Sequence, residues 1–360
     1  MSTKTKMKKS VFLVLSLLIF GSIIFAQAII ENPEKPLSKN AGRVLELQEV
    51  LRITDESGEF YFNRPSLINV ANDGCIYIRD EDQFLKFSSQ GDFIKNMFKK
   101  GQGPGEIQSS FSYGLKNDNI YIYDRMNRKT ICLDKGGILI KELPLKEKGM
   151  LQFIGVVDDR IIFSRLKMPP REEMTGKFIN MENQLISISL KDKTEKEIAK
   201  ILTRWWFSPN MGMSFDPFLV ILSSNGQSLY INHTQEYMIK VLDVKTGEVI
   251  KTFKRKYKRV KEKKRTGGVR SNVRIKTPKR EFMSDIRYFF DGGETLWVRT
   301  STTDKTKGSL FDIFDKEGNY IDSFYLNAKR SLVTVHKDYI FVRETDEEEM
   351  ISIVKYKIVK

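Results

Sequence analysis

A short phrase recurs six times along the chain, a run of apolar or aromatic residues that ends in polar ones. The fourth residues of its six copies are Arg79, Tyr123, Ser164, Asn232, Arg299 and Arg343. The intervals between these residues are 44, 41, 68, 67 and 44 residues, which describe one repeated unit with two insertions. Units of about 40 to 45 residues built from short strands are typical of β-propeller blades. The repeat therefore predicts an all-β fold, a six-bladed β-propeller of four-stranded antiparallel blades.

The last unit provides only three strands from the C-terminal end, over residues 331–335, 339–343 and 350–357. An unpaired strand edge favours aggregation, and ring closure removes such edges. Arg43–Ile53 is apolar and belongs to no other unit. We therefore expect an N-terminal strand from this segment to complete the last blade, and residues 29–360 to form a single domain.

Residues 1–28 have the features of an export signal. Four lysines precede the apolar run Val11–Phe25, and Ala28 ends a small-residue cleavage site. A membrane anchor is the alternative, but this run has 15 residues, whereas a bilayer span needs about 20. We expect a signal peptide and an exported protein, periplasmic or extracellular, with no transmembrane anchor after signal removal.

The segment between the first two blades reads Gly101-Gln102-Gly103-Pro104-Gly105-Glu106. In this segment the chain resembles the bacterial exported six-bladed β-propeller family related to NHL-repeat proteins, whose Gly-x-Gly-Pro-Gly-Glu turn it matches in full. The resemblance is sharp only over residues 65–106, because Arg165, His233 and Thr300 stand where the family's pattern has Asp. It implies the fold and export but little chemistry.

A phosphate-binding loop is another interpretation of these glycines. A dinucleotide-binding loop is followed by a helix, whereas Phe111-Ser112-Tyr113 opens another strand. We therefore expect a structural turn, in which the Glu106 carboxylate accepts hydrogen bonds from turn amides.

Loops that follow the second and fourth strands of a blade emerge on one face of the ring. The insertions at 168–181, 205–216 and 254–280 all follow such strands, so we expect this elaborated face to be the binding face. The central strands end on the same face. We predict a ligand site at the channel mouth formed by Arg79, Asp80, Tyr123, Asp124, Asn232, His233, Arg299 and Arg343.

Arginines from several blades can together bind a carboxylate, phosphate or sulfate group. The alternative is that each arginine pairs with a neighbouring Asp or Glu and seals the ring. Arg165 and Glu344 end central strands on the same face. Asp80 and Asp124 have a structural alternative too, because an Asp directly after a strand commonly caps a turn.

The positive charge of the chain is concentrated in one segment. The formal net charge is +15, and residues 254–280 contain fourteen Lys or Arg and a single acid, Glu262. We predict polyanion binding by Lys254, Arg255, Lys256, Lys258, Arg259, Lys261, Lys263, Lys264 and Arg265. Trp205 and Trp206 would add a stacking platform. The alternatives are a solvated insertion and tryptophans packed in the core.

The sequence shows few signs of a metal site or of a Ser-His-acid catalytic triad. His233 and His336 are expected on opposite faces of the ring, so they cannot share a metal ion, and no Gly-x-Ser-x-Gly motif is present. We expect no metal and no cofactor. Cys75 and Cys132 are expected to be buried free thiols, with a disulfide in an oxidising compartment as the alternative. The leading hypothesis is a binding or scaffold module for an anionic polymer or envelope component. The alternatives are a glycan- or lactone-directed hydrolase or lyase, and a module that assembles with a protein partner in the envelope.

Overall fold

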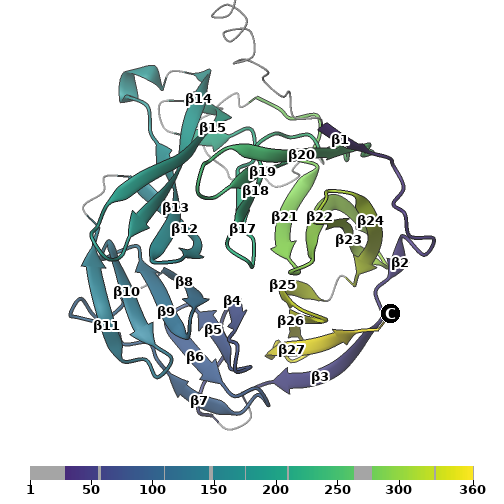
Figure 1. The fold of residues 1–360 in the computed structure, drawn as a ribbon. Coiled ribbons are helices and arrows are strands. Elements are labelled where there is room, and N and C mark those ends of the chain that lie inside the picture. The colour runs from purple at the N-terminus through teal and green to yellow at the C-terminus, as the bar shows by residue number, and fades with distance from the viewer. Residues whose placement is uncertain are drawn as a thin grey trace, which may run out of the picture.

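Six small antiparallel sheets are arranged around a central axis in the computed structural model (Figure 1). The structure describes residues 29–55, 58–108, 110–145, 149–174, 176–208, 211–262, 278–327 and 330–359. The predicted signal peptide, residues 1–28, lies outside these residues. The six sheets confirm the predicted six-bladed β-propeller. No helix in the described ranges is long and apolar enough to cross a membrane.

Each blade runs from an inner strand at the axis to an outer strand at the rim. Blade 1 contains β4 (Pro65–Val70), β5 (Ile76–Asp80), β6 (Gln83–Phe87) and β7 (Phe93–Asn96). Blade 2 contains β8 (Phe111–Lys116), β9 (Asn119–Asp124), β10 (Lys129–Asp134) and β11 (Leu139–Pro144). Blade 3 contains β12 (Met150–Val157), β13 (Arg160–Lys167), β14 (Lys177–Ser189), β15 (Glu195–Ser208) and β16 (Met211–Ser214).

The remaining blades follow the same order. Blade 4 contains β17 (Leu219–Leu222), β18 (Ser228–Asn232), β19 (Met238–Asp243) and β20 (Val249–Arg255). Blade 5 contains β21 (Ile286–Asp291), β22 (Thr295–Asp304), β23 (Gly308–Asp315) and β24 (Tyr320–Leu326). Blade 6 contains β25 (Ser331–His336), β26 (Tyr339–Thr345), β27 (Ile351–Ile358) and, from the N-terminal side, β3 (Leu47–Ile53).

The hydrophobic core consists of six clusters, each between two neighbouring blades. Between blades 6 and 1, for example, Phe341 and Ile353 pack with Ile78 and Phe87, all fully buried. The continuous apolar runs of the central strands explain this arrangement, because both faces of a blade are covered by neighbours. The cluster between blades 6 and 1 closes the ring.

The N-terminal segment forms a belt around the outside of three blades (Figure 1). Strand β1 (Ile29–Asn32) pairs in parallel with β20 of blade 4, and β2 (Arg43–Val44) pairs in parallel with β24 of blade 5. Strand β3 then pairs antiparallel with β27. This confirms closure by an N-terminal strand. The strand that completes blade 6, β3, starts at Leu47 rather than at Arg43. Arg43–Val44, which was expected to belong to it, covers the edge of blade 5.

Asn32 fastens the start of this belt between blades 4 and 5. Its buried side-chain amide donates to the carbonyl oxygens of Lys254 (3.1 Å) and Gly318 (2.9 Å), and its Oδ1 accepts from the backbone N of Tyr320 (2.8 Å). A single side chain thus satisfies backbone groups of two blades.

Blade 3 extends as a long hairpin beyond its neighbours (Figure 1). Strand β14 begins at Lys177, within the stretch expected to be an insertion, and pairs with β15 as far as Phe207. The segment after Trp205, also expected to be a loop, continues β15 and turns back as β16. Residues in both of these segments therefore form paired strands that extend blade 3, and the repeat length alone did not predict this extension.

The Gly-x-Gly-Pro-Gly-Glu segment is a closed turn. The Glu106 carboxylate accepts from the backbone N of Gly103 (2.8 Å), and Glu142 accepts from that of Gly105 (2.8 Å). The buried Lys129 ammonium donates to the Gly103 carbonyl (2.7 Å) and to Glu142 (3.0 Å). Because side chains within the fold occupy these turn groups, the contacts confirm the structural interpretation of the glycines.

Candidate functional site

The residue at the fourth position of the central strand is an arginine in three consecutive blades and an uncharged residue in the other three. In blades 5, 6 and 1, which are consecutive around the ring, it is Arg299, Arg343 and Arg79. In blades 2, 3 and 4 it is Tyr123, Ser164 and Asn232. Positive charge at this level is therefore confined to one side of the mouth.

A cavity of about 680 Å³ lies beside these arginines, within the size range of small-molecule sites. It is lined by the inner strands of blades 1, 4, 5 and 6, and by Arg299 and Arg343 from the central strands. The inner strands of blades 2 and 3 do not line it. There, Phe153 packs on Gly114, and a Cβ on Gly155 would lie 2.7 Å from Leu222 Cδ2. Close packing over these glycines places the cavity off the centre of the ring.

Arg299 and Arg343 are available for a ligand. Within the described part of the chain, neither guanidinium has a carboxylate within ion-pair distance or a hydrogen-bond partner. The cross-strand neighbour of Arg299 is Tyr288, whose side chain is 57% exposed in the cavity wall. The cross-strand neighbour of Arg343 is the exposed Ser331. Two free guanidinium groups with neighbouring hydroxyls can bind an acidic group.

Arg79 is occupied by contacts within the ring. Its guanidinium donates to Ser66 Oγ (2.7 Å) and to the backbone oxygen of Phe111, the first residue of blade 2 (2.5 Å). Burial lowers the pKa of Arg79 from its usual value. Arg165 also has partners, since it pairs with Glu195 at 2.6 Å. Arg165 thus pairs with an acid of its own blade, whereas Arg79 binds a backbone carbonyl of the next blade rather than an acid.

Asp80 and Asp124 are fully buried and bind backbone amides. Asp80 accepts from the N–H groups of Asn63 (2.6 Å) and Arg64 (2.5 Å), and burial raises its pKa. Asp124 accepts from those of Gln108 (2.8 Å) and Met126 (3.0 Å). Both carboxylates hold the loops that precede or follow their strands, and neither lines the cavity.

The other predicted mouth residues lie away from this cavity. Asn232 is buried and donates to the backbone oxygens of Glu236 and Met238. His233 is half-buried in blade 4, and burial lowers its pKa. Tyr123 borders a separate hollow of about 300 Å³ between blades 2 and 3, together with Arg125 and Arg128. The sequence repeat did not single out these two exposed arginines.

The basic segment is only partly described, and Lys263, Lys264 and Arg265 lie outside the described residues. Lys256, Lys258 and Lys261 are exposed. Lys254 Nζ lies 3.9 Å from a Glu31 carboxylate oxygen. Arg259 pairs with Asp285 at 3.0 Å.

The Arg255 side chain points into the interior of the protein. Its guanidinium pairs with the fully buried Asp312 and lies over the ring of Tyr320, 4.4 Å from the centroid. Tyr237 and Tyr320 each donate a hydroxyl hydrogen bond of 2.8 Å to the same carboxylate. This cluster joins blades 4 and 5, so Arg255 is not available to a polyanion.

The two tryptophans differ in exposure. Trp206 is buried in the blade 3 hairpin, at 7% exposure. Trp205 is half-buried, stacks on Phe207 with ring centroids 5.9 Å apart and donates its indole N–H to Thr203. Exposed aromatic surface is instead provided by Phe178, over which Arg204 lies.

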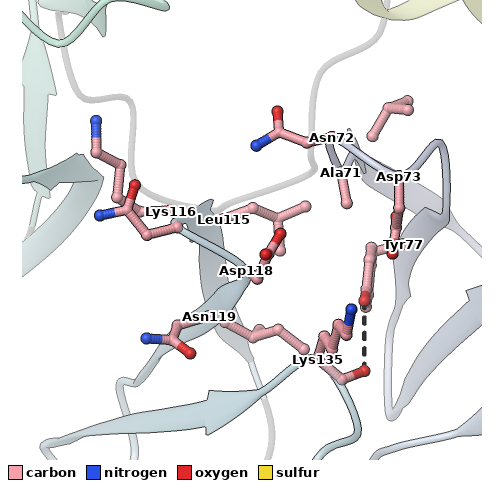
Figure 2. Close-up of a pocket in the computed structure, with 12 residues that line it drawn as sticks. Ala71, Asn72, Asp73, Tyr77, Leu115, Lys116, Asp118, Asn119 and Lys135 are labelled. Carbon is pink, nitrogen blue, oxygen red and sulfur yellow. Dashed lines mark hydrogen bonds between the residues drawn. The ribbon is translucent and has the colours of Figure 1, made fainter.

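A small hollow on the opposite face lies between the turns of blades 1 and 2 (Figure 2). It is lined by Lys116, Asp118 and Asn119 around the turn between β8 and β9, and by Asp73 and Tyr77 of blade 1 (Figure 2). Its volume of about 100 Å³ is room for roughly three water molecules at about 30 Å³ each. It therefore lies below the roughly 300–1,000 Å³ of typical small-molecule sites.

The described residues contain no group of three His, Cys, Asp or Glu side chains that could hold a metal ion. His336 borders the cavity at the end away from the arginines, while His233 does not border it. Cys75 and Cys132 are not bonded to each other.

Comparisons with known proteins support the fold. Residues 43–205 match the profile of a family described as DUF5128, 6-bladed beta-propeller. The crystal structure of a candidate exported protein of Bacteroides fragilis is similar with a TM-score of 0.56 at 13% identity, over 92% of this chain and 100% of that one. A DUF4221 family member from Bacteroides vulgatus has a TM-score of 0.54 at 11% identity, over 90% and 100% of the two chains. A search of curated proteins gave no match.

Proposed function

We propose that this chain is an exported six-bladed propeller that acts as a binding module, and that Arg299 and Arg343 bind the acidic group of its ligand. The observation that carries the proposal is the pair of guanidinium groups that border one cavity and have no acidic partner among the described residues. Two like charges that border one cavity without acidic partners in the described part of the chain favour the binding of an anion there. Carboxylate, phosphate and sulfate have the geometry that a guanidinium binds best.

The surrounding groups support binding of an anion. Tyr288 and Ser331, which carry hydroxyl groups, are the cross-strand neighbours of Arg299 and Arg343 in the cavity wall. The exposed Lys256, Lys258 and Lys261 belong to the loop between blades 4 and 5, on the side of the ring where the arginines end their strands. Exposed cations near a site attract anions and raise the rate of association. The features of residues 1–28 support export.

The proposal is tested by calorimetric titration of residues 29–360 with glucuronate, glucose 6-phosphate and neutral glucose. We expect an acidic sugar to bind and glucose to bind more weakly. Arg299→Gln/Arg343→Gln should weaken binding of the acid by about 100-fold or more, because each of the two charged hydrogen bonds contributes about 1.5–3 kcal/mol in such sites.

Arg125→Gln/Arg128→Gln is the matched control, because it removes the same charge from a different hollow. Equal weakening by both pairs would contradict a specific site and indicate general charge attraction. A third variant, with residues 256–279 replaced by a short Gly/Ser turn, tests the basic loop. Loss of binding in that variant alone would indicate that the acid binds to the basic loop and not to Arg299 and Arg343.

A further inference from the structure

We infer that the ligand of this cavity is an amphiphilic acid, with its acidic group at Arg299 and Arg343 and an apolar body inside the ring. The inference rests on the proposed function and adds the chemical class of the ligand. It comes from the order in which polar and apolar side chains follow one another along the cavity wall.

Strand register gives the depth of each wall residue. In blade 6, Ser331 is opposite Arg343, and His336 at the other end of β25 is opposite Tyr339. In blade 5, Tyr288 is opposite Arg299, and Asp291 ends β21 opposite Leu296. All these β21 and β25 residues border the one cavity. The cavity therefore extends from the arginines along the whole length of the inner strands, about 16 Å for β25 at 3.3 Å per residue.

The middle of the wall is largely apolar. Between the two ends, blade 6 contributes Leu332 and Val333, blade 5 contributes Phe290 and blade 4 contributes Ile221, beside the polar Thr334 and Asn69. The apolar side chains offer water no hydrogen-bond partner, so an apolar body that displaces this water gains free energy in proportion to the buried area. A small inorganic anion would fill only the arginine end of 680 Å³.

The two ends differ in charge, which orients the ligand. Asp291 lines the end away from the arginines, where its carboxylate accepts from the backbone N–H groups of Ser224 and Gly293. This carboxylate repels an acidic group, whereas Arg299 and Arg343 attract one. An amphiphilic acid therefore enters with its apolar body directed toward Asp291 and its acid at the arginines.

The test is a titration with straight-chain carboxylates, acetate, hexanoate and decanoate, below the concentration at which they form micelles. We expect affinity to rise with chain length, by up to about fourfold per buried methylene. Decanol and decylamine have the same tail without the acid and should bind more weakly than decanoate. Affinity that does not depend on tail length would overturn the inference and leave the proposed anion site intact.

Two variants separate the inference from the proposed function. Thr334→Trp places a bulky ring in the cavity wall away from the arginines, and should abolish the gain from chain length while acetate binding persists. Thr334→Val is its control and should retain the gain. Arg299→Gln/Arg343→Gln should instead weaken binding at every chain length. A length dependence unchanged by Thr334→Trp, in a protein with native melting temperature, would show that the tails bind elsewhere.

Discussion

Arg255 and Asp312 form an ion pair between blades 4 and 5 in which the side chains are 8% and 0% exposed. Burial lowers the pKa of Arg255, but the combined attraction of Asp312, Tyr237 and Tyr320 leaves the net pKa raised. Burial also raises the pKa of Asp312, against which the Arg255 charge and the hydroxyl hydrogen bonds of Tyr237 and Tyr320 stabilise the carboxylate. A polar cluster in an otherwise apolar blade interface fixes how these two blades meet.

Asp312→Asn is expected to lower the free energy of unfolding by about 3–5 kcal/mol, because it leaves the Arg255 charge buried without its partner. Urea denaturation measures the change. The control is Asp322→Asn, which breaks the more exposed pair between Arg43 and Asp322 and should cost about 1 kcal/mol or less. Equal effects of the two substitutions would contradict the role given to the buried cluster.

Asn32→Ala should destabilise the protein by about 2 kcal/mol, since it removes three hydrogen bonds and leaves buried backbone groups of blades 4 and 5 unsatisfied. Hydrogen exchange should show faster opening of β1 and of the β20 edge that it covers. Asn40→Ala, at an exposed position of the same belt, should leave both measurements unchanged. A destabilisation by Asn40→Ala as large as that by Asn32→Ala would argue against a specific fastening.

Gly101→Ala should destabilise the turn between blades 1 and 2 by about 1–3 kcal/mol, because its Cβ would lie 1.9 Å from Glu106 Oε2. Shortening the obstructing side chain separates this clash from other effects. In a double-mutant cycle, Gly101→Ala should cost less in a Glu106→Ala background than in the native protein. Additive effects would indicate that the two residues do not interact.

Stability should fall as the pH drops below about 6.5, partly through His233 and His336. Burial lowers the pKa of both. The unfolded chain therefore takes up protons at a higher pH than the native state, so this contribution is complete above pH 6.5 and declines as the pH falls toward the native pKa. Urea midpoints at pH 7.5 and 5.5 measure it.

The His233→Gln/His336→Gln variant serves as the reference for this pH effect. Its midpoint should fall less between the two pH values than that of the native protein. Asp80 and Asp291, whose pKa burial raises, are present in both proteins, so their contributions cancel in the comparison. Identical falls would assign the acid sensitivity to other groups.

Much of the fold was predictable because its signal is local and repeated. The apolar central strands gave the blade count, and the shortage of a strand in the last unit indicated the pairing of β3 with β27. The extra strand β16 and the belt strands β1 and β2 were not predicted. They depend on pairing with blade edges, and a four-residue strand such as β1 carries no periodic signal of its own.

The candidate site was predictable only in part. The repeat placed Arg299 and Arg343 at the end of the central strands, but it could not show that Arg79 and Arg165 have partners while these two do not. Such partners come from other strands or blades and are set by side-chain packing. Tyr288 and Leu332 were missed because inner-strand residues face either a neighbouring blade or the cavity, and the sequence pattern is the same in both cases.

The belt also constrains the order in which the molecule can be assembled. Ile29 pairs with Thr252, and Arg43 pairs with Phe324, so the partners of these residues are synthesised long after them. Contacts so distant in sequence form late, once local hairpins exist. Nascent chains that stop before blade 4 would therefore lack the partner of β1, and those that stop before blade 5 would lack the partner of β2. Strands β1 and β2 are therefore synthesised first but pair with their partner strands late in folding.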